Sequence, residues 1–385
     1  MHLTSSQVLA LTEETLRQFL SLCIPEGLYL DYKEALSGTT EKEAKREFLK
    51  DVTAFANAAG GQLFLGVKEP SEGVSIDAQL VGLSDGDTIA QDLERLASTS
   101  IDPRIPGLRI VPVQLANGRT CVIAHIPPSL GRPHMVSYAG HRSFYVRHSE
   151  SSFPMTTHEV RESVLTSSSA EARARMFLDH RLREVCESIG DRQPALFLQA
   201  VPLIAPEPAW DVLNTPFENV IRGNARRDQY QHYAELASSN APVPTIDGIL
   251  GQDQREQPLW ETEVHRTGYI SLLYRDIQVH KVGEVDRFVL HSGDTDVFRA
   301  FCHMLRECLE VAATDVPYVI AATYLNAEGT CLWTESRRMK FSMPYKKKNI
   351  VWPIHLRPTG SDAMEIAERL ALGLFNAFGF KEVVK

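Results

Sequence analysis

The chain has 385 residues, of which 43% are hydrophobic and 23% are charged, and this globular composition excludes a disordered or fibrous protein. Its length predicts two or three domains. Forty Lys and Arg residues against 49 Asp and Glu residues give a net charge of −9, which excludes a uniformly basic nucleic-acid-binding protein. A local basic surface is still compatible with that charge.

Neither a membrane span nor a signal peptide is expected. No apolar run is long enough to cross a bilayer, and the first residues lack a charged segment followed by an apolar one. The six cysteines are scattered and form no CxxC pair, a pattern typical of reduced, buried thiols and unlike a structural zinc site. These features predict a cytoplasmic protein.

The first elements follow from helical periodicity and capping signals. Residues 12–24 are predicted to form an amphipathic helix capped by Thr12, within a separate N-terminal segment, 1–25. A short strand should follow and end near Lys33. The clearest helix is expected over 40–58, where Thr40 and Glu43 form a capping box and two glycines follow.

The rest of the first domain, residues 26–160, is predicted to combine strands and helices. The predicted elements are a strand at 63–67, a helix at 86–98, strands at 108–115 and 119–126, and a strand at 144–146. Asn117-Gly118 is a favourable hairpin turn between two of these strands. The pattern indicates an α/β (α+β) fold.

A connector helix is expected over 161–190, with Ser167–Ser169 capping its charged part. A proline-rich stretch follows. Residues 191–385 are then predicted to form a second α/β domain of unknown type. Its expected helices are 297–311 and 361–377, and its expected strands are 317–324 and 350–356.

Three carboxylates stand out in the first domain. Glu26 and Asp31 flank the entrance of the first strand, and Glu69 follows the buried strand. If these strands are neighbours, the three acids meet at one edge of the sheet, with Lys33 and Lys68 beside them. Clustered carboxylates suit Mg²⁺ or Mn²⁺, which prefer oxygen ligands. The alternative is that these side chains are simply solvated strand ends.

Four motifs in order resemble the Schlafen AlbA_2 domain: E-G-L-Y-L-D-Y-K-E, F-A-N-A-A-G-G-Q-L-F-L-G-V-K-E, G-R-P-H and F-Y-V-R-H-S. The resemblance covers about 26–160. It implies either nucleic-acid binding linked to transcription or metal-dependent cleavage of tRNA or other RNA. In the nucleases of this family three acids hold a divalent metal, and Glu26, Asp31 and Glu69 occupy the matching positions.

The chain departs from the family pattern in three respects. The second and third acids are Asp and Glu, where the family has Glu and Asp. The zinc-binding Cys and His residues of the animal proteins are absent. Only one copy of the domain is evident, whereas the animal nucleases pair two lobes, so a groove between lobes requires a homo-oligomer or the second domain.

The charge of the first domain is divided along the chain. Residues 26–102 carry a net charge of −8, whereas 103–149 contain no acid and a net charge of +6. Guanidinium groups bind phosphate in a planar fork, so this arginine-rich half is predicted to contact a nucleic-acid backbone. The alternative is that these arginines balance the charge of acidic residues across the sheet. The six arginines are Arg104, Arg109, Arg119, Arg132, Arg142 and Arg147.

Aromatic and histidine side chains accompany these arginines. Tyr138, Phe144 and Tyr145 are candidates for stacking on bases, or for the core. In G-R-P-H, His134 is a candidate phosphate contact or general acid, or else satisfies a backbone group. A second basic stretch at 337–348 suits single-stranded nucleic acid, or a solvated edge strand protected by lysines.

The leading hypothesis is a metal-dependent endoribonuclease, with RNA favoured over DNA. Glu26, Asp31 and Glu69 would hold Mg²⁺ or Mn²⁺, and Lys33 or Lys68 would stabilise the transition state. A nuclease joined to a second domain suits a bacterial defence effector whose second domain senses a trigger protein or ligand. The alternative is a non-catalytic DNA-binding regulator, and a third hypothesis is a purely structural oligomerisation protein.

Overall fold

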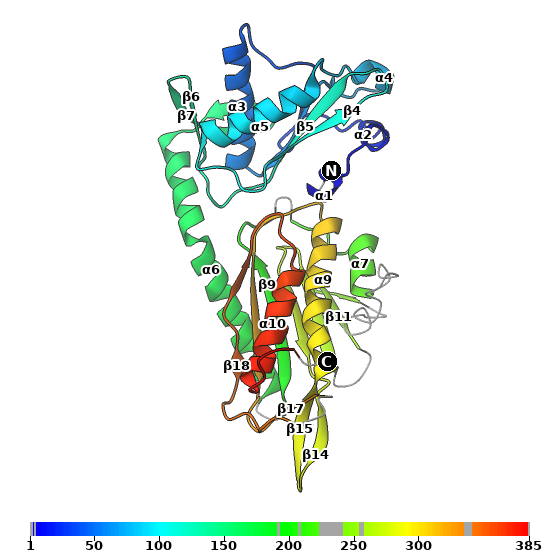
Figure 1. Cartoon of the computed structure of the whole chain (residues 1–385), viewed down its shortest axis with the longest axis vertical. Coiled ribbons are helices and arrows are strands. Elements are labelled where there is room, and N and C mark those ends of the chain that lie inside the picture. The colour runs from blue at the N-terminus through cyan, green and yellow to red at the C-terminus, as the bar shows by residue number, and fades with distance from the viewer. Residues whose placement is uncertain are drawn as a thin grey trace. The chain divides into compact units, whose positions relative to one another are not determined.

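The computed structural model describes residues 3, 5–190, 193–206, 209–222, 242–253, 258–334 and 341–383 (Figure 1). The chain divides into two compact units. The first unit comprises 1–170 and 313–316, and the second comprises 171–312 and 317–385. Both units combine helices with sheets, which confirms the predicted α/β (α+β) class.

The first unit contains a four-stranded sheet in the order β1-β2-β5-β4. Its strands are β1 (Leu30–Lys33), β2 (Gly61–Leu65), β4 (Arg109–Gln114) and β5 (Thr120–Ile126). β1 is parallel to β2, whereas β5 is antiparallel to both of its neighbours. Because successive side chains of a strand point to opposite faces, the fully buried β2 and β5 require cover on both faces.

Helices α3 (Glu41–Asn57) and α5 (Gly86–Ser100) cover one face of this sheet. Helix α2 (Glu13–Leu20), with the shorter α1 (Ser5–Leu9) and α4 (Ile76–Gln79), belongs to the other side. Phe19 of α2 stacks on Phe64 of β2 with ring centroids 5.4 Å apart. The N-terminal segment is therefore part of the first unit and supplies one of its three layers.

A second sheet of the first unit has the order β3-β6-β7-β8. Its strands are β3 (Ile101–Asp102), β6 (Met135–Tyr138), β7 (His141–His148) and β8 (Ser151–Pro154). Asn57, the last residue of α3, fastens the helix to this sheet. Its amide donates to the carbonyls of His134 and Tyr145, and its side-chain oxygen accepts the backbone N–H of His134.

The capping and turn signals read from the sequence at Thr40 and Asn117-Gly118 agree with the structure of the first unit. Thr40 caps α3 through the N–H of Glu43, although the Glu43 carboxylate bonds Thr39 rather than closing the predicted box. The Asn117-Gly118 hairpin is confirmed by the pairing of β4 with β5. Ser167–Ser169, however, lie inside α6 (Thr157–Ile189), which begins after the reciprocal cap of Thr156 and Glu159. The true start of that helix is thus a T-x-x-E box.

The second unit is built on an eight-stranded antiparallel sheet with the order β10-β11-β12-β13-β9-β16-β18, and β19 also pairs with β16. Its strands are β9 (Ala195–Pro202), β10 (Val243–Pro244), β11 (Gly248–Gln252), β12 (Trp260–His265), β13 (Ile270–Tyr274), β16 (Tyr318–Leu325), β18 (Ile350–Val351) and β19 (His355–Arg357). The last turns of α6 pack their apolar side chains against alternate residues of β9, which places that strand at the centre of the unit.

Helices α9 (Asp296–Val311) and α10 (Met364–Ala377) lie side by side on this unit, and α7 (Thr215–Arg222) packs against α9 (Figure 1). A separate sheet joins β14 (Gln278–Val282), β15 (Val285–His291) and β17 (Cys331–Trp333). The β14–β15 hairpin extends beyond the larger sheet (Figure 1). The short helix η1 (Ser292–Thr295) links β15 to α9.

The predicted helices and the first predicted strand of the second domain are confirmed. The strand expected over 350–356 is instead two short strands, β18 and β19. The central strand β9 was not predicted, because the prolines around it were interpreted as a boundary. Within the basic stretch 337–348, residues 337–340 lie outside the described residues. No helix in the described part of the chain is long and apolar enough to cross a membrane.

Replacing Phe19 by alanine is expected to lower the free energy of unfolding of the first unit by about 3–5 kcal/mol, because a large side chain that is 5% exposed leaves a cavity. Urea denaturation measures the change. Leu22→Ala is the control, since Leu22 follows the same helix and is 54% exposed. Equal effects of the two substitutions would contradict the packing of α2 on the sheet.

Candidate functional site

Two of the three acids predicted from the sequence, Glu26 and Asp31, have neighbouring carboxyls, and Glu69 lies beside the backbone of Glu26. The backbone N–H of Glu26 donates to Glu69 Oε1 at 3.1 Å, and Glu26 Oε1 accepts the N–H of Tyr32 at 2.9 Å. The carboxyl of Asp31 neighbours that of Glu26, close enough for one to hydrogen-bond to the other. The result is a carboxylate cluster in which the carboxyls of Glu26 and Asp31 are neighbours and Glu69 contacts the backbone of Glu26.

Asp31 is the fixed point of this cluster. Its residue is 1% exposed, and both carboxylate oxygens have cationic partners. Lys33 Nζ lies 2.9 Å from Oδ1, and Arg147 Nη1 lies 3.3 Å from Oδ2. Burial of a carboxylate is costly unless it is paired in this way, so these two contacts hold Asp31 in one orientation.

Arg147 lies in the interior of the first unit and is 2% exposed. Besides Asp31, its guanidinium donates to the carbonyls of Gly27 at 2.8 Å and Leu30 at 3.1 Å. It also lies over the ring of Phe55, 4.4 Å from the centroid. This placement corrects the prediction that Arg147 binds a nucleic-acid backbone, because its donors are used inside the protein.

Asp51 is a fourth acid that the sequence reasoning missed. It is buried on α3, and its carboxylate accepts a hydrogen bond from Ser152 Oγ at 3.0 Å. Burial and the negative charge of Asp31 raise the pKa of Asp51. A signal was present in the sequence, since Asp51 lies three residues after Phe48 and four before Phe55, on the apolar face of the helix.

The cluster carries more negative than positive charge. Its acids are Glu26, Asp31, Asp51 and Glu69, and its cations are Lys33 and Arg147. Burial, together with the neighbouring Asp31 carboxyl, raises the pKa of Glu26 although the Tyr32 N–H opposes the shift. Such an excess of half-buried negative charge favours the binding of a cation.

The chemistry of the acids suits a hard divalent cation, because every candidate donor atom is a carboxylate oxygen. Among the residues that the structure describes, however, no group of three or more acids, histidines and cysteines is arranged to hold a metal ion. Mg²⁺ needs only one or two protein carboxylates when water and substrate phosphate supply its other ligands. Glu26 and Asp31 are the two adjacent carboxyls of the cluster, and their binding of a metal ion stays a prediction.

The two candidate lysines differ in their relation to the cluster. Lys33 is half-buried, and although burial lowers its pKa, the hydrogen bond to Asp31 raises it overall. Lys68 is exposed, and its ammonium lies 3.9 Å from Glu34 rather than against the carboxylate pair. Lys33 is therefore the cation that the structure brings to the site.

The other five arginines predicted to bind nucleic acid lie nearer the surface. Four are exposed: Arg104, Arg109, Arg119 and Arg142. Arg119 donates to the carbonyl of Gly82 through two nitrogens, at 2.9 and 3.1 Å. Arg132 is half-buried and donates to the carbonyl of Ala58 at 3.1 Å. Contact of the exposed arginines with phosphate stays a prediction.

His134 is buried and belongs to the interior. Its Nδ1 hydrogen-bonds the carbonyl of Pro103 at 2.6 Å, and its backbone N–H donates to Asn57. Burial lowers the pKa of His134 although the bond to Pro103 opposes this, so the imidazole is neutral at pH 7. The predicted contact of His134 with phosphate is corrected to an internal hydrogen bond.

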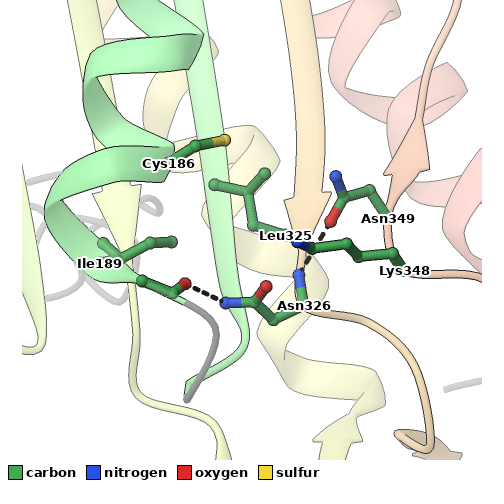
Figure 2. Close-up of a pocket in the computed structure, with 7 residues that line it drawn as sticks. Cys186, Ile189, Leu325, Asn326, Lys348 and Asn349 are labelled. Carbon is green, nitrogen blue, oxygen red and sulfur yellow. Dashed lines mark hydrogen bonds between the residues drawn. The ribbon is translucent and has the colours of Figure 1, made fainter.

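The second unit contains a small pocket between the end of α6 and the end of β16 (Figure 2). Asn326 crosses it and donates to the carbonyls of Gly190 and Gln193, while its backbone N–H donates to Asn349 Oδ1 at 3.0 Å. Lys348 lies on the same wall as Asn349 (Figure 2). These polar groups fasten α6 to the sheet.

A family model described as Schlafen, AlbA_2 matches residues 26–156. The match spans the carboxylate cluster and all six arginines, and it ends just before α6. The resemblance drawn from the four motifs is thereby confirmed for this segment. Members of the family are generally connected with nucleic acids. No curated protein matches the chain.

Removing the Arg147 guanidinium with Arg147→Met is expected to lower the free energy of unfolding of the first unit by about 3–5 kcal/mol, because buried Asp31 would lose one of its two cationic partners and two carbonyls would lose their donor. Denaturant titration of the full chain measures the loss. Arg142→Met on the same strand is the matched control, because Arg142 is exposed. An Arg147 variant as stable as the Arg142 variant would contradict the internal role.

Proposed function

We propose that the first unit is a divalent-metal-dependent nuclease that cleaves RNA, with tRNA or single-stranded RNA as its substrate class. The observation that carries the proposal is the pair of adjacent carboxylates, Glu26 and Asp31, in a half-buried cluster with excess negative charge. The family match supports a nucleic-acid substrate. A divalent cation held by carboxylates beside a nucleic acid is suited to catalyse hydrolysis of a phosphodiester bond.

In this proposal Glu26 and Asp31 would hold Mg²⁺ or Mn²⁺, and the exposed Glu69 stands beside them. The bound ion would activate water and stabilise the charge that develops on the phosphate. Arg147 holds the Asp31 carboxylate in position from the interior. Lys33, paired with the same carboxylate and partly exposed, is placed to stabilise negative charge on the substrate.

The exposed arginines of 103–149 would bind the substrate backbone. They lie in a segment without any acidic residue, so their charge is not cancelled by neighbours along the chain. Phosphate contacts of this kind position a nucleic acid without reading its sequence. We extend the proposal to a homo-oligomer and to a trigger protein or ligand at the second unit, as in a defence effector.

A non-catalytic DNA-binding regulator is the second candidate. The observation that favours it is that both oxygens of Asp31 already have cationic partners, with Arg147 inside the domain. In that case the cluster stabilises the fold, and the exposed arginines alone carry the function.

Glu26→Gln is expected to abolish metal-dependent cleavage of labelled tRNA and single-stranded RNA, because the amide keeps the shape of the side chain and removes its charge. Cleavage is followed by gel electrophoresis with Mn²⁺ and with EDTA, beside matched DNA. Glu34→Gln is the control, because Glu34 is an exposed glutamate immediately after β1. Binding of DNA by the wild type, without cleavage of RNA or DNA in any condition, would contradict the nuclease and favour the regulator.

The pKa of Glu26 is expected to lie above the ordinary glutamate value of 4.5, because burial disfavours the carboxylate. A bound divalent cation favours the carboxylate, so saturating Mg²⁺ should lower that pKa. Carboxyl ¹³C chemical shifts of labelled glutamates, titrated from pH 3 to 8, measure both values, and Glu26→Gln identifies the signal. A pKa that Mg²⁺ and Mn²⁺ leave unchanged would contradict metal binding at Glu26.

A further inference from the structure

Two histidines of the second unit face each other through the same ring nitrogen. His280 lies on β14 and His291 ends β15, the two strands of the projecting hairpin (Figure 1). Their Nε2 atoms are 3.1 Å apart, and their rings meet at 70° with centroids 5.0 Å apart. A contact between these two atoms makes one imidazole the donor and the other the acceptor.

The same arrangement suits a metal ion. When both rings carry their proton on Nδ1, both Nε2 lone pairs are free to bind one ion that lies beside the line joining the two nitrogens. Two imidazoles bound tetrahedrally to one ion at 2.0–2.1 Å place their nitrogens about 3.3 Å apart. The observed separation differs from this value by only a few tenths of an ångström, so little movement is required to admit an ion.

We propose that His280 and His291 form a binding site for a first-row divalent transition metal of the Zn²⁺ class. Imidazole nitrogen selects such ions over Mg²⁺ and Ca²⁺, which prefer oxygen. Within the described ranges no third histidine, cysteine or acid completes a ligand group. The pair therefore supplies two ligands, and the remaining coordination positions belong to water or to a group from another molecule.

The surroundings of the pair leave one ring oriented and the other accessible. The His291 ring packs on Trp333 of β17 at a centroid distance of 5.1 Å, and its backbone N–H donates to Asp294 Oδ2 at 2.7 Å. His280 is exposed. His291 is thus held in place by packing, whereas the exposed His280 can adjust its ring to a bound ion.

Isothermal titration of the metal-free full chain with ZnCl₂ tests the proposal. His280→Ala and His291→Gln are each expected to bind one Zn²⁺ fewer per chain than wild type, or to bind it at least tenfold more weakly. His141→Ala is the matched control, because His141 is an exposed strand histidine of the first unit. Unchanged stoichiometry and affinity in His280→Ala, whose exposed site leaves folding intact, would overturn the proposal.

Trp333 supplies a second, independent measurement. A paramagnetic ion such as Co²⁺ bound beside His291 should quench the fluorescence of Trp333, with saturation at one ion. The quenching is expected to disappear in Trp333→Phe, which keeps the histidines, and in His280→Ala, which keeps the tryptophan. Quenching that persists in His280→Ala would also overturn the proposal. Neither measurement depends on the nuclease site of the first unit.

Discussion

The first unit depends on one buried ion pair, between Arg147 and Asp31. Removing a guanidinium from water is costly, and the structure offsets this cost with a carboxylate, two backbone carbonyls and the face of Phe55. The side chain reaches from β7 of one sheet to β1 of the other and touches α3 between them. A single residue therefore fixes the relative position of three elements.

The same pair explains why the acids gather where they do. Because Arg147 fixes the position of the Asp31 carboxyl, an acid placed beside it lies next to a second carboxyl in a buried setting. Both Glu26 and Asp51 have a raised pKa, and in each case burial adds to the effect of Asp31. A fold selected only for stability would place apolar groups there. Accumulated carboxylates of this kind are typical of functional sites, where local stability is given up for chemistry.

The sequence predicted those parts of the site that depend on local signals. The cap at Thr40 and the turn at Asn117 follow from short-range patterns. The adjacency of Glu26 and Asp31 also agrees with their placement around one strand, whereas the pairing of β1 with β2 was a condition that the sequence left open. The role of Arg147 was beyond such reasoning, because its partner lies 116 residues away. The local sequence around an arginine on a strand is the same whether its side chain contacts phosphate or a buried aspartate.

The two units offer metal ions different donor atoms. The first unit gathers carboxylate oxygens around Glu26 and Asp31, and the second places the Nε2 atoms of His280 and His291 3.1 Å apart. Hard cations prefer the first set and Zn²⁺-class ions the second. Occupancy of one site therefore leaves the other available, since the ions compete little for each other's ligands. The chain thus combines an oxygen cluster suited to phosphodiester chemistry with a nitrogen pair whose open coordination suits attachment to another molecule.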